Sequence, residues 1–370
     1  MKTRAAVLWE RNTPWSIEEV ELDAPRAHEV LVRLESSGMC HSDDHVLKGD
    51  LPARVPLIGG HEGAGVVEAV GPEVAGLREG DHVVLAFIPA CGHCRWCSSG
   101  RQNLCDVGAG LMEGLPISDG VPRAHARGQG LSAMSLLGTF TRHTVVHEYS
   151  CVKIDPDIPL KYASLVGCGV TTGFGSAINR AQVQPGDTVV VVGTGGVGAS
   201  AVQAARIAGA EIIVAVDSVE FRRDAAKALG ATHTASSMEE ALPLVADLTR
   251  GVMADRTILT VGLMIGSMIA ELLALTRKGG RACLTSAPSS TEVKADLVLL
   301  DFIMSEKELV GAVYGGSNPA ADIPKLLRLY KSGQLKLDEM VTRTYSLDEI
   351  NDGYVDTLSG SILRGLITFD

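Results

Sequence analysis

Clusters of basic residues are absent from this sequence of 370 residues. It contains 33 lysine and arginine residues against 44 aspartate and glutamate residues, which gives a formal net charge of −11. Binding to nucleic-acid phosphates needs clustered lysine and arginine side chains, so we expect no nucleic-acid partner. Binding to an anionic membrane surface is disfavoured for the same reason.

The sequence also lacks a long hydrophobic run. Residues 257–270 are uncharged, but these 14 residues are fewer than the ~20 that a membrane-spanning helix needs. We expect a buried strand that leads into a buried helix there. Residues 1–12 (MKTRAAVLWERN) contain no apolar signal core, which predicts a cytoplasmic protein. Disulfides are uncommon in that compartment, so clustered cysteines suggest metal binding or catalysis.

A chain of this length exceeds the usual size of one hydrophobic core and predicts two domains. Residues 1 to about 160 contain short β-like runs, such as 29–34 and 80–87, with turn signals between them. Between about 165 and 310, apolar runs of strand length alternate with helix-like stretches. This alternation is typical of an α/β fold with a doubly wound parallel sheet that helices cover on both faces.

The expected elements follow from these patterns. The strands of the parallel sheet lie at 188–193, 211–217, 257–262, 281–286 and 308–315, and its first two helices at 197–210 and 219–230. Near the end of the chain, residues 346–360 begin like a helix with Ser346 as N-cap, and residues 362–369 resemble a strand. The pattern alone leaves open whether this last part packs with the first region.

A glycine-rich turn, GTGGVG at residues 193–198, follows an expected strand and opens an expected helix. Gly193 permits a tight turn, Gly195 lets the backbone approach a pyrophosphate, and Gly198 lets helix and strand pack closely. The helix N-terminus, with Gly196 and Val197, offers unpaired amides and a partial positive charge to phosphates. The turn therefore predicts a dinucleotide site.

Asp217 ends the next expected strand, 19 residues after Gly198. From that position a carboxylate can accept hydrogen bonds from the adenosine ribose, and it would repel a 2′-phosphate. NAD is therefore favoured over NADP. Arg222 and Arg223 weaken this preference, because an arginine can hold such a phosphate. The alternative for Asp217 is a helix N-cap.

Four cysteines lie within CGHCRWCSSGRQNLC, namely Cys91, Cys94, Cys97 and Cys105. Four thiolates leave no position open on a zinc ion, so the cluster predicts a closed structural site. Redox chemistry at the C-x-x-C pairs is one alternative, although such motifs usually accompany a thioredoxin-like pattern. A nucleic-acid-binding zinc ribbon is another, but its ligands form two separated pairs and the net charge opposes it.

A second set of possible ligands is scattered along the chain. Cys40 lies in GMCHSDDH, His61 in a glycine-flanked turn, and Cys168 in VGCGVTTG. Two thiolates and one imidazole would give a tetrahedral zinc site with one open position, which is the catalytic arrangement. Taken singly, each residue has a plainer interpretation, as a small buried cysteine or a core histidine.

The segment GHEGAGVVEAVGPEV, residues 60–74, resembles the signature of the zinc-dependent medium-chain alcohol dehydrogenases. The residues that carry this resemblance are Gly60, His61, Glu62, Gly65 and Gly71. The cysteine cluster, GCGVTTG and GTGGVG follow in the family's order, so the resemblance covers nearly the whole chain. The segment 106–138 resembles the long-loop branch, which also contains the glutathione-dependent formaldehyde dehydrogenases.

Several runs resemble the nicotinoprotein alcohol dehydrogenases, which reduce nitrosodimethylaniline while NAD stays bound. These runs lie at residues 40–52, 94–106, 248–262 and 317–351. For the fold, the resemblance implies a mostly β GroES-like catalytic domain formed by residues 1–164 and 311–370, with both zinc sites. Residues 165–310 would then form the NAD-binding Rossmann domain.

The resemblance also implies roles for single residues. Cys40, His61 and Cys168 match the catalytic zinc ligands, and Asp43 matches the carboxylate that orients the zinc histidine. Ser42 matches the hydroxyl that receives the substrate proton, and His45 matches the outlet of the proton relay, whose alternative is a solvated surface histidine. The remaining matches are Glu62 beside the metal, Phe87 in the pocket wall, Thr172 near the nicotinamide, His41 and Arg364 at the pyrophosphate, and Arg222 near the adenosine ribose. His41 replaces the arginine of many members, and a neutral imidazole holds phosphate less firmly.

The implied function is oxidation of primary alcohols to aldehydes, or the reverse, by hydride transfer to NAD, with two zinc ions per chain. The resemblance further implies a small-molecule substrate and a homo-oligomer, a dimer or larger. One alternative is a glutathione- or mycothiol-dependent formaldehyde dehydrogenase. Another is a catalytically silent redox or zinc sensor, against which the intact ligand and relay residues argue.

Overall fold

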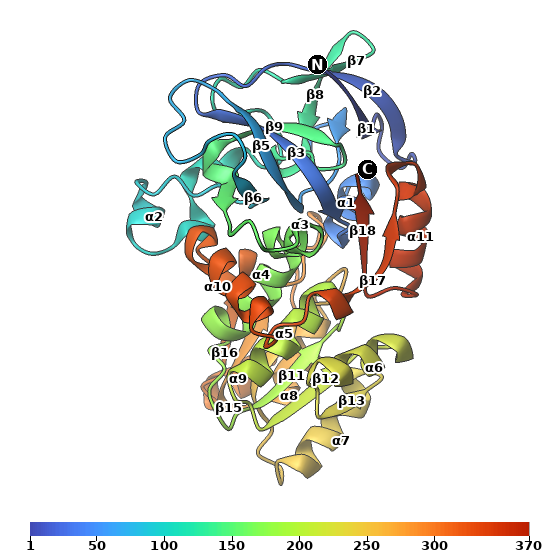
Figure 1. The fold of residues 1–370 in the computed structure, drawn as a ribbon. Helices are drawn as coiled ribbons and strands as arrows, with labels where there is room; N and C mark the ends of the chain where they lie inside the picture. Colours follow the sequence, from blue (N-terminus) through green and yellow to red (C-terminus); the bar gives the residue numbers. More distant parts are fainter. Residues whose placement is uncertain (370) are drawn as a thin grey trace. The chain divides into compact units, whose positions relative to one another are not determined.

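A computed structural model describes residues 1–369 of the chain, which divide into two compact units (Figure 1). The first unit contains Met1–Cys168 and the segment from Asn318 onward, and the second contains Gly169–Ser317. The units change over at residues 168/169 and 317/318, a few residues after the expected domain limits. The first limit moves because Cys168 lies with the cysteine and histidine of the first unit. The second moves because the turn Tyr314–Gly316 packs on helix α4 (Gly169–Gly175).

The first unit is built mainly of β-strands. One group of strands closes into a barrel, in the order β1 (Lys2–Leu8), β2 (Ser16–Leu22), β7 (Ala124–Ala126), β8 (Gln129–Ala133) and β4 (Leu57–Ile58). The second group forms a sheet in the order β10 (Cys151–Lys153), β6 (His82–Leu85), β5 (Gly63–Val70), β3 (Glu29–Gly38), β18 (Arg364–Thr368) and β17 (Val341–Tyr345), with β9 (His143–His147) paired to β3. Both groups agree with the expected mostly β, GroES-like domain. The segment 106–138, which carried no structural prediction, contributes β7 and β8 to the barrel.

The first unit also contains helices. They are α1 (His41–Lys48), α2 (Arg95–Ser98), α3 (Leu160–Ala163), α10 (Pro319–Lys331) and α11 (Ile350–Ser359). The expected helix after Ser346 begins with a 3-10 turn, in which the Ser346 and Glu349 side chains form a reciprocal capping box, and α11 starts at Ile350. Strand β18 pairs antiparallel with β3, and this pairing returns the end of the chain to the first unit.

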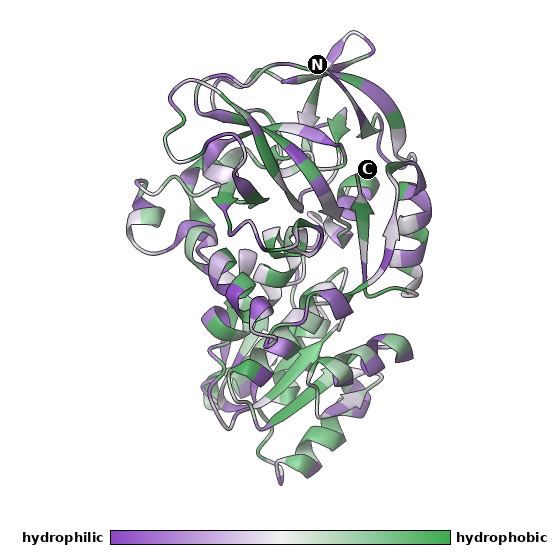
Figure 2. Cartoon of the chain, in the orientation of Figure 1, coloured by the Kyte–Doolittle hydropathy of each residue, from purple (hydrophilic) through white to green (hydrophobic). Residues whose placement is uncertain are grey.

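The second unit contains the expected doubly wound sheet, and all its strands are parallel. Their order is β13 (His233–Ala235), β12 (Ile212–Val216), β11 (Thr188–Val192), β14 (Ala254–Leu259), β15 (Thr276–Leu284) and β16 (Glu308–Gly311). The helices are α4, α5 (Gly196–Ile207), α6 (Glu220–Leu229), α7 (Met238–Leu248), α8 (Met268–Leu275) and α9 (Leu299–Met304). Each residue of β11 is buried, and Figure 2 shows β11 and β12 as continuously hydrophobic ribbons. Such strands are covered on both faces, as the apolar runs predicted.

Residues 257–270 contain the end of β14 and the first residues of α8, so the expected order of strand and then helix is confirmed. Within residues 1–369, no helix is long and apolar enough to cross a membrane.

Candidate active site and metal centres

The three scattered ligands predicted from the sequence meet in the first unit. One ligand atom from each of Cys40, His61, Glu62 and Cys168 lies within 4.8 Å of the others. Cys40 follows β3 and is the N-cap of α1, His61 lies between β4 and β5, and Cys168 follows a 3-10 turn. The first unit therefore brings residues 128 positions apart to one point.

Gly60 makes the tight turn before His61 possible. Its φ is +84°, and a Cβ atom at this position would lie 2.5 Å from Phe140 Cδ1. A larger residue would be strained and would clash with the Phe140 ring. The glycine in the signature thus sets the direction in which His61 points.

Asp43 holds the histidine. Its Oδ1 accepts a hydrogen bond from His61 Nδ1 at 2.9 Å, and its Oδ2 accepts one from the Cys40 backbone N–H at 3.0 Å. With Nδ1 protonated, the second ring nitrogen, Nε2, carries the lone pair that a metal needs. This arrangement supports the role that the resemblance gave to Asp43.

A further residue, Tyr354 on α11, was not found by sequence analysis. Its hydroxyl donates to Asp43 Oδ2 at 2.7 Å, and its side chain is buried. Burial, together with the Asp43 carboxylate, raises the pKa of Tyr354 well above its ordinary value, so the phenol stays protonated. Tyr354 lies 311 residues from Asp43, and no local motif marks it.

Glu62 and Arg364 form a buried ion pair beside the ligands, in which the guanidinium Nη2 donates to Glu62 Oε2. Burial raises the pKa of Glu62 to about 7, although Arg364 opposes the rise. The resemblance placed Arg364 at a pyrophosphate, and the structure places its Nη2 on Glu62. Its Nε is buried and has no hydrogen-bond partner within the described chain, which leaves one donor for a further acceptor.

The protonation of the ligands depends on their neighbours. A hydrogen bond from the Cys168 thiol lowers the pKa of Cys40 well below its ordinary value, although burial opposes this, and the same bond and burial raise the pKa of Cys168. Burial lowers the pKa of His61, but Asp43 and Cys40 outweigh it and raise that pKa. Two sulfur donors and one imidazole are the donor set of catalytic zinc, so this group fits a zinc ion with one open position.

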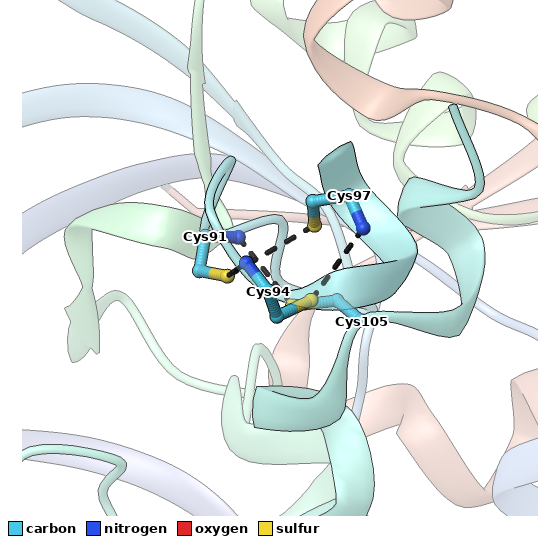
Figure 3. A group of neighbouring side chains, drawn as sticks. All are labelled: Cys91, Cys94, Cys97 and Cys105. Carbon is cyan, nitrogen blue, oxygen red and sulfur yellow. Dashed lines mark hydrogen bonds between the residues drawn. The ribbon is translucent and has the colours of Figure 1, made fainter. Parts of the chain in front are cut away.

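The four cysteines of the second cluster surround a common point, as Figure 3 shows. The Sγ atoms of Cys91 and Cys97 lie 4.0 Å apart, and those of Cys94 and Cys105 lie 3.9 Å apart. Four sulfurs at about 2.3 Å from a tetrahedral zinc ion would be about 3.8 Å apart, so the cluster fits zinc almost without change.

Backbone amides also point at these sulfurs. The N–H of Cys94 donates to Cys91 Sγ at 3.3 Å, and that of Cys97 donates to Cys94 Sγ at 3.5 Å. The hydrogen bond from the Cys97 backbone amide lowers the pKa of Cys94 to about 6, whereas burial raises the pKa of Cys97 to about 12. All cysteines of the chain are free thiols, so no disulfide competes with metal binding.

The two residues that the resemblance assigns to a proton relay, Ser42 and His45, lie on α1. Ser42 Oγ is 3.7 Å from Cys40 Sγ. His45 is buried, and its Nδ1 lies 3.1 Å from Asp50 Oδ2. The alternative of a solvated surface histidine is therefore wrong.

His41, expected at the pyrophosphate, is the first residue of the same helix. The Phe87 ring meets the His61 ring edge to face, with centroids 6.0 Å apart, as a wall residue would.

In the second unit, the glycine turn has the geometry that a dinucleotide requires. Gly193 has a φ of +85°, and a Cβ atom at Gly198 would lie 1.8 Å from the Gly193 carbonyl oxygen. At Gly195, the N-cap of α5, a Cβ atom would meet no protein atom within 4 Å. Gly196 and Val197 form the first turn of α5. The buried Thr172 Oγ1 has no hydrogen-bond partner in the described residues. These features fit a bound dinucleotide.

Asp217 lies next to this turn. Its Oδ2 accepts from the Thr194 N–H at 2.8 Å, and its Oδ1 accepts from the Val219 N–H at 2.9 Å. Val219 is the N-cap of α6, so the alternative of Asp217 as helix N-cap is wrong. Arg223 donates to the Asp217 carbonyl at 2.7 Å, and Arg222 lies in the first turn of α6. The Asp217 carboxylate is thus fixed at the end of β12, where the sequence predicted it.

The fold and the two thiol-rich clusters define a zinc-dependent dehydrogenase. Residues 26–156 match the family described as alcohol dehydrogenase GroES-like domain, and residues 196–332 match the zinc-binding dehydrogenase family. Alcohol dehydrogenase B of Mycobacterium tuberculosis is 50% identical over 370 residues, which are 100% of this chain and 99% of that protein. The NDMA-dependent alcohol dehydrogenase of Amycolatopsis methanolica is 47% identical over 367 residues, 99% of each chain. The chain belongs to the zinc-binding alcohol dehydrogenase family.

Structural comparison agrees. The crystal structure of benzyl alcohol dehydrogenase from Acinetobacter calcoaceticus is 30% identical and matches with a TM-score of 0.92 over 100% of both chains. The predicted family, fold class, enzyme class and zinc cofactor are confirmed. Because these relatives are named as alcohol dehydrogenases, the formaldehyde dehydrogenase alternative is not favoured.

Proposed function

We propose that this enzyme oxidises primary alcohols to aldehydes, or catalyses the reverse reaction, with an NAD that stays bound and an external electron acceptor. The observation that carries the proposal is the convergence of Cys40, His61 and Cys168 in one group, of which His61 and Cys168 are buried. The tightly bound NAD rests on the 47% identity to a relative named for its dependence on NDMA, an electron acceptor.

Each unit has its own part in this proposal. The first unit, Met1–Cys168 with the segment from Asn318 onward, forms the catalytic domain, and the second unit, Gly169–Ser317, forms the NAD-binding domain. The two zinc-fitting clusters lie in the first unit and the glycine turn in the second, which supports this division.

We assign the catalytic zinc to Cys40, His61 and Cys168, with Asp43 orienting His61. The ion, when bound, supplies positive charge that lowers the pKa of a hydroxyl group at its open position. Glu62 lies beside the ligands and is available to approach the metal. The structural zinc belongs to Cys91, Cys94, Cys97 and Cys105, whose lobe it stabilises.

The substrate proton leaves through side chains of α1. Ser42 receives the proton of the alcohol, and His45 passes it towards solvent, since proton transfer needs partners within hydrogen-bond reach. Phe87 forms part of the wall of the substrate pocket. The edge-to-face contact of Phe87 with His61 supports that position.

NAD, when bound, supplies the hydride acceptor, and the chain supplies the contacts that orient it. The turn from Gly193 to Gly198 would hold the pyrophosphate, since the helix N-terminus attracts negative charge. Asp217 and Arg222 would bind the adenosine ribose, Thr172 would serve the nicotinamide, and His41 and Arg364 would bind the pyrophosphate. The unpartnered Thr172 Oγ1 and Arg364 Nε support these assignments.

We further propose a cytoplasmic homo-oligomer, a dimer or larger. The free cysteines agree with a reducing compartment. Strand β16 is an edge of its sheet, and the neighbouring α9 exposes large apolar side chains, which soluble monomers rarely leave uncovered. These side chains are Leu299, Leu300, Ile303 and Met304. Sedimentation of the purified protein tests this part of the proposal.

One experiment tests the proposed function. The protein is gel-filtered and then denatured, and the released NAD and zinc are measured. We expect one NAD and two zinc ions per chain, and turnover of a primary alcohol with nitrosodimethylaniline as acceptor. Absence of NAD after gel filtration would instead indicate an enzyme that exchanges its cofactor. Activity with formaldehyde only in the presence of a thiol would favour the formaldehyde dehydrogenase alternative.

A further inference from the structure

His45, the last side chain of the proposed proton relay, has a carboxylate partner. Its Nδ1 lies 3.1 Å from Asp50 Oδ2. The side chain of His45 is 7% exposed and that of Asp50 is 25% exposed, so Asp50 is the more solvent-accessible member of the pair. No role was predicted for Asp50 from the sequence.

The end of helix α1 brings the two residues together. Gly49 has a φ of +88° and its N–H donates to the His45 carbonyl at 3.0 Å, which reverses the chain. The Leu51 N–H donates to the same carbonyl at 3.2 Å. These two bonds fix Asp50 between them, and its carboxylate returns to the ring of His45 five positions earlier.

We propose that Asp50 is a positioning residue for the proton relay. A carboxylate can only accept, so Asp50 holds the proton of neutral His45 on Nδ1 and leaves Nε2 as the acceptor. This inference rests on the proposed function, in which His45 passes the substrate proton towards solvent. The hydrogen bond between Asp50 and Nδ1 thus makes Nε2 the nitrogen that accepts the arriving proton.

The proton balance is simple. Nε2 forms an N–H bond with the arriving proton, and the ring becomes a cation while the Asp50 carboxylate stays ionised. The cation then returns one proton to water and becomes neutral again. Asp50 stabilises the charged ring during this interval, because opposite charges at hydrogen-bond distance attract strongly in a partly buried site. No oxidant or further reactant is needed.

Other charged groups near His45 are already engaged. Asp44, the preceding residue, pairs with Lys48 at 2.8 Å. Arg11 packs against Gly49, and its Nη2 donates to the Ala53 carbonyl at 3.0 Å. Asp50 is therefore the carboxylate that the structure aims at the imidazole.

The test replaces Asp50 by asparagine in the enzyme loaded with zinc and NAD. Asn can present an amide donor to Nδ1, which would favour the other tautomer of His45. We expect kcat to fall about 10- to 100-fold, as when an orienting partner is removed.

Nitrogen NMR of His45 gives a readout that does not depend on activity. We expect the proton on Nδ1 in the original enzyme and on Nε2 in Asp50→Asn. An unchanged tautomer, or a kcat equal to that of the original enzyme, would overturn the proposal. Asp50→Glu keeps a carboxylate, so recovery of kcat in that variant would separate positioning from a folding defect.

Asp23→Asn is a matched control. Asp23 Oδ2 lies 3.2 Å from His125 Nε2, in an exposed histidine–aspartate pair of the same unit. We expect this substitution to leave kcat unchanged. His45→Ala separates the two proposals: if it has no effect, the relay itself fails, whereas an effect of His45→Ala without one of Asp50→Asn refutes only the role of Asp50.

Discussion

The hydroxyl of Tyr354 donates a hydrogen bond of 2.7 Å to Asp43, the carboxylate that also holds the zinc-fitting His61 at 2.9 Å. A residue from the last helix of the chain thus supports a ligand near its beginning. Partners of this kind fix the orientation of metal ligands and tune their basicity. The C-terminal segment is therefore part of the metal site as well as of the sheet.

Tyr354→Phe keeps the ring and removes only this hydrogen bond. We expect zinc affinity at the catalytic site to fall about tenfold. The loss of the buried donor should also destabilise the protein by about 1–2 kcal/mol. Chelator competition and urea unfolding of the zinc-loaded protein measure the two effects.

Tyr345→Phe serves as the control. Tyr345 is also buried, and its hydroxyl donates to Asp356 at 2.7 Å, a pair that includes neither Asp43 nor a zinc-fitting residue. It should show a similar loss of stability without a change in zinc affinity. Equal zinc affinities in all three proteins would refute the supporting role of Tyr354.

Local motifs could be read from the sequence, and contacts between distant segments could not. The glycine turn and the four-cysteine cluster were predicted because their function lies in consecutive residues, where spacing alone sets the geometry. The pairs Tyr354–Asp43 and Arg364–Glu62 join residues more than 300 positions apart, which only the packing of α11 and β18 brings together. The scattered ligands were found through a family signature, since none has a local pattern of its own.

Substitution by alanine should have different effects at two glycines of the dinucleotide turn. A Cβ atom at Gly198 would lie 1.8 Å from the Gly193 carbonyl oxygen, so Gly198→Ala must push α5 from β11. We expect a loss of stability of about 3 kcal/mol, at the upper end for overpacking. Thermal unfolding of the protein without added NAD measures this loss.

Gly195→Ala should leave the fold intact. Gly195 has a φ of −64°, which alanine adopts, and a Cβ atom there meets no protein atom within 4 Å. The added methyl group would instead enter the space of the pyrophosphate. We expect NAD affinity to fall tenfold or more, equal to ~1.4 kcal/mol, as measured by calorimetry. Unchanged affinity would place the pyrophosphate elsewhere.

The stability of the folded protein depends on pH through the protonation of His28. A hydrogen bond with Glu148 raises the pKa of His28, with Glu73 adding to the rise and partial burial opposing it. Because the pKa in the folded state exceeds the unfolded one, the stabilisation is fully present below about pH 6.5. It is lost as the pH rises through the folded pKa.

His28→Asn tests this dependence, since His28 has a φ of +62° and asparagine tolerates that conformation. In urea unfolding, the free energy of unfolding of the original protein should exceed that of the variant at pH 5.5. This difference should be smaller at pH 8.5. Glu148→Gln should remove most of this difference. A stability difference of the same size at both pH values would argue against the His28–Glu148 pair.

In our proposal, the scattered residues Cys40, His61 and Cys168 hold the catalytic zinc, and the four clustered cysteines hold a separate structural one. The zinc content of purified His61→Ala, taken together with its rate of alcohol oxidation, tests this assignment. We expect one zinc ion per chain, a folded protein and no measurable turnover. Two zinc ions per chain, or turnover at the original rate, would contradict it.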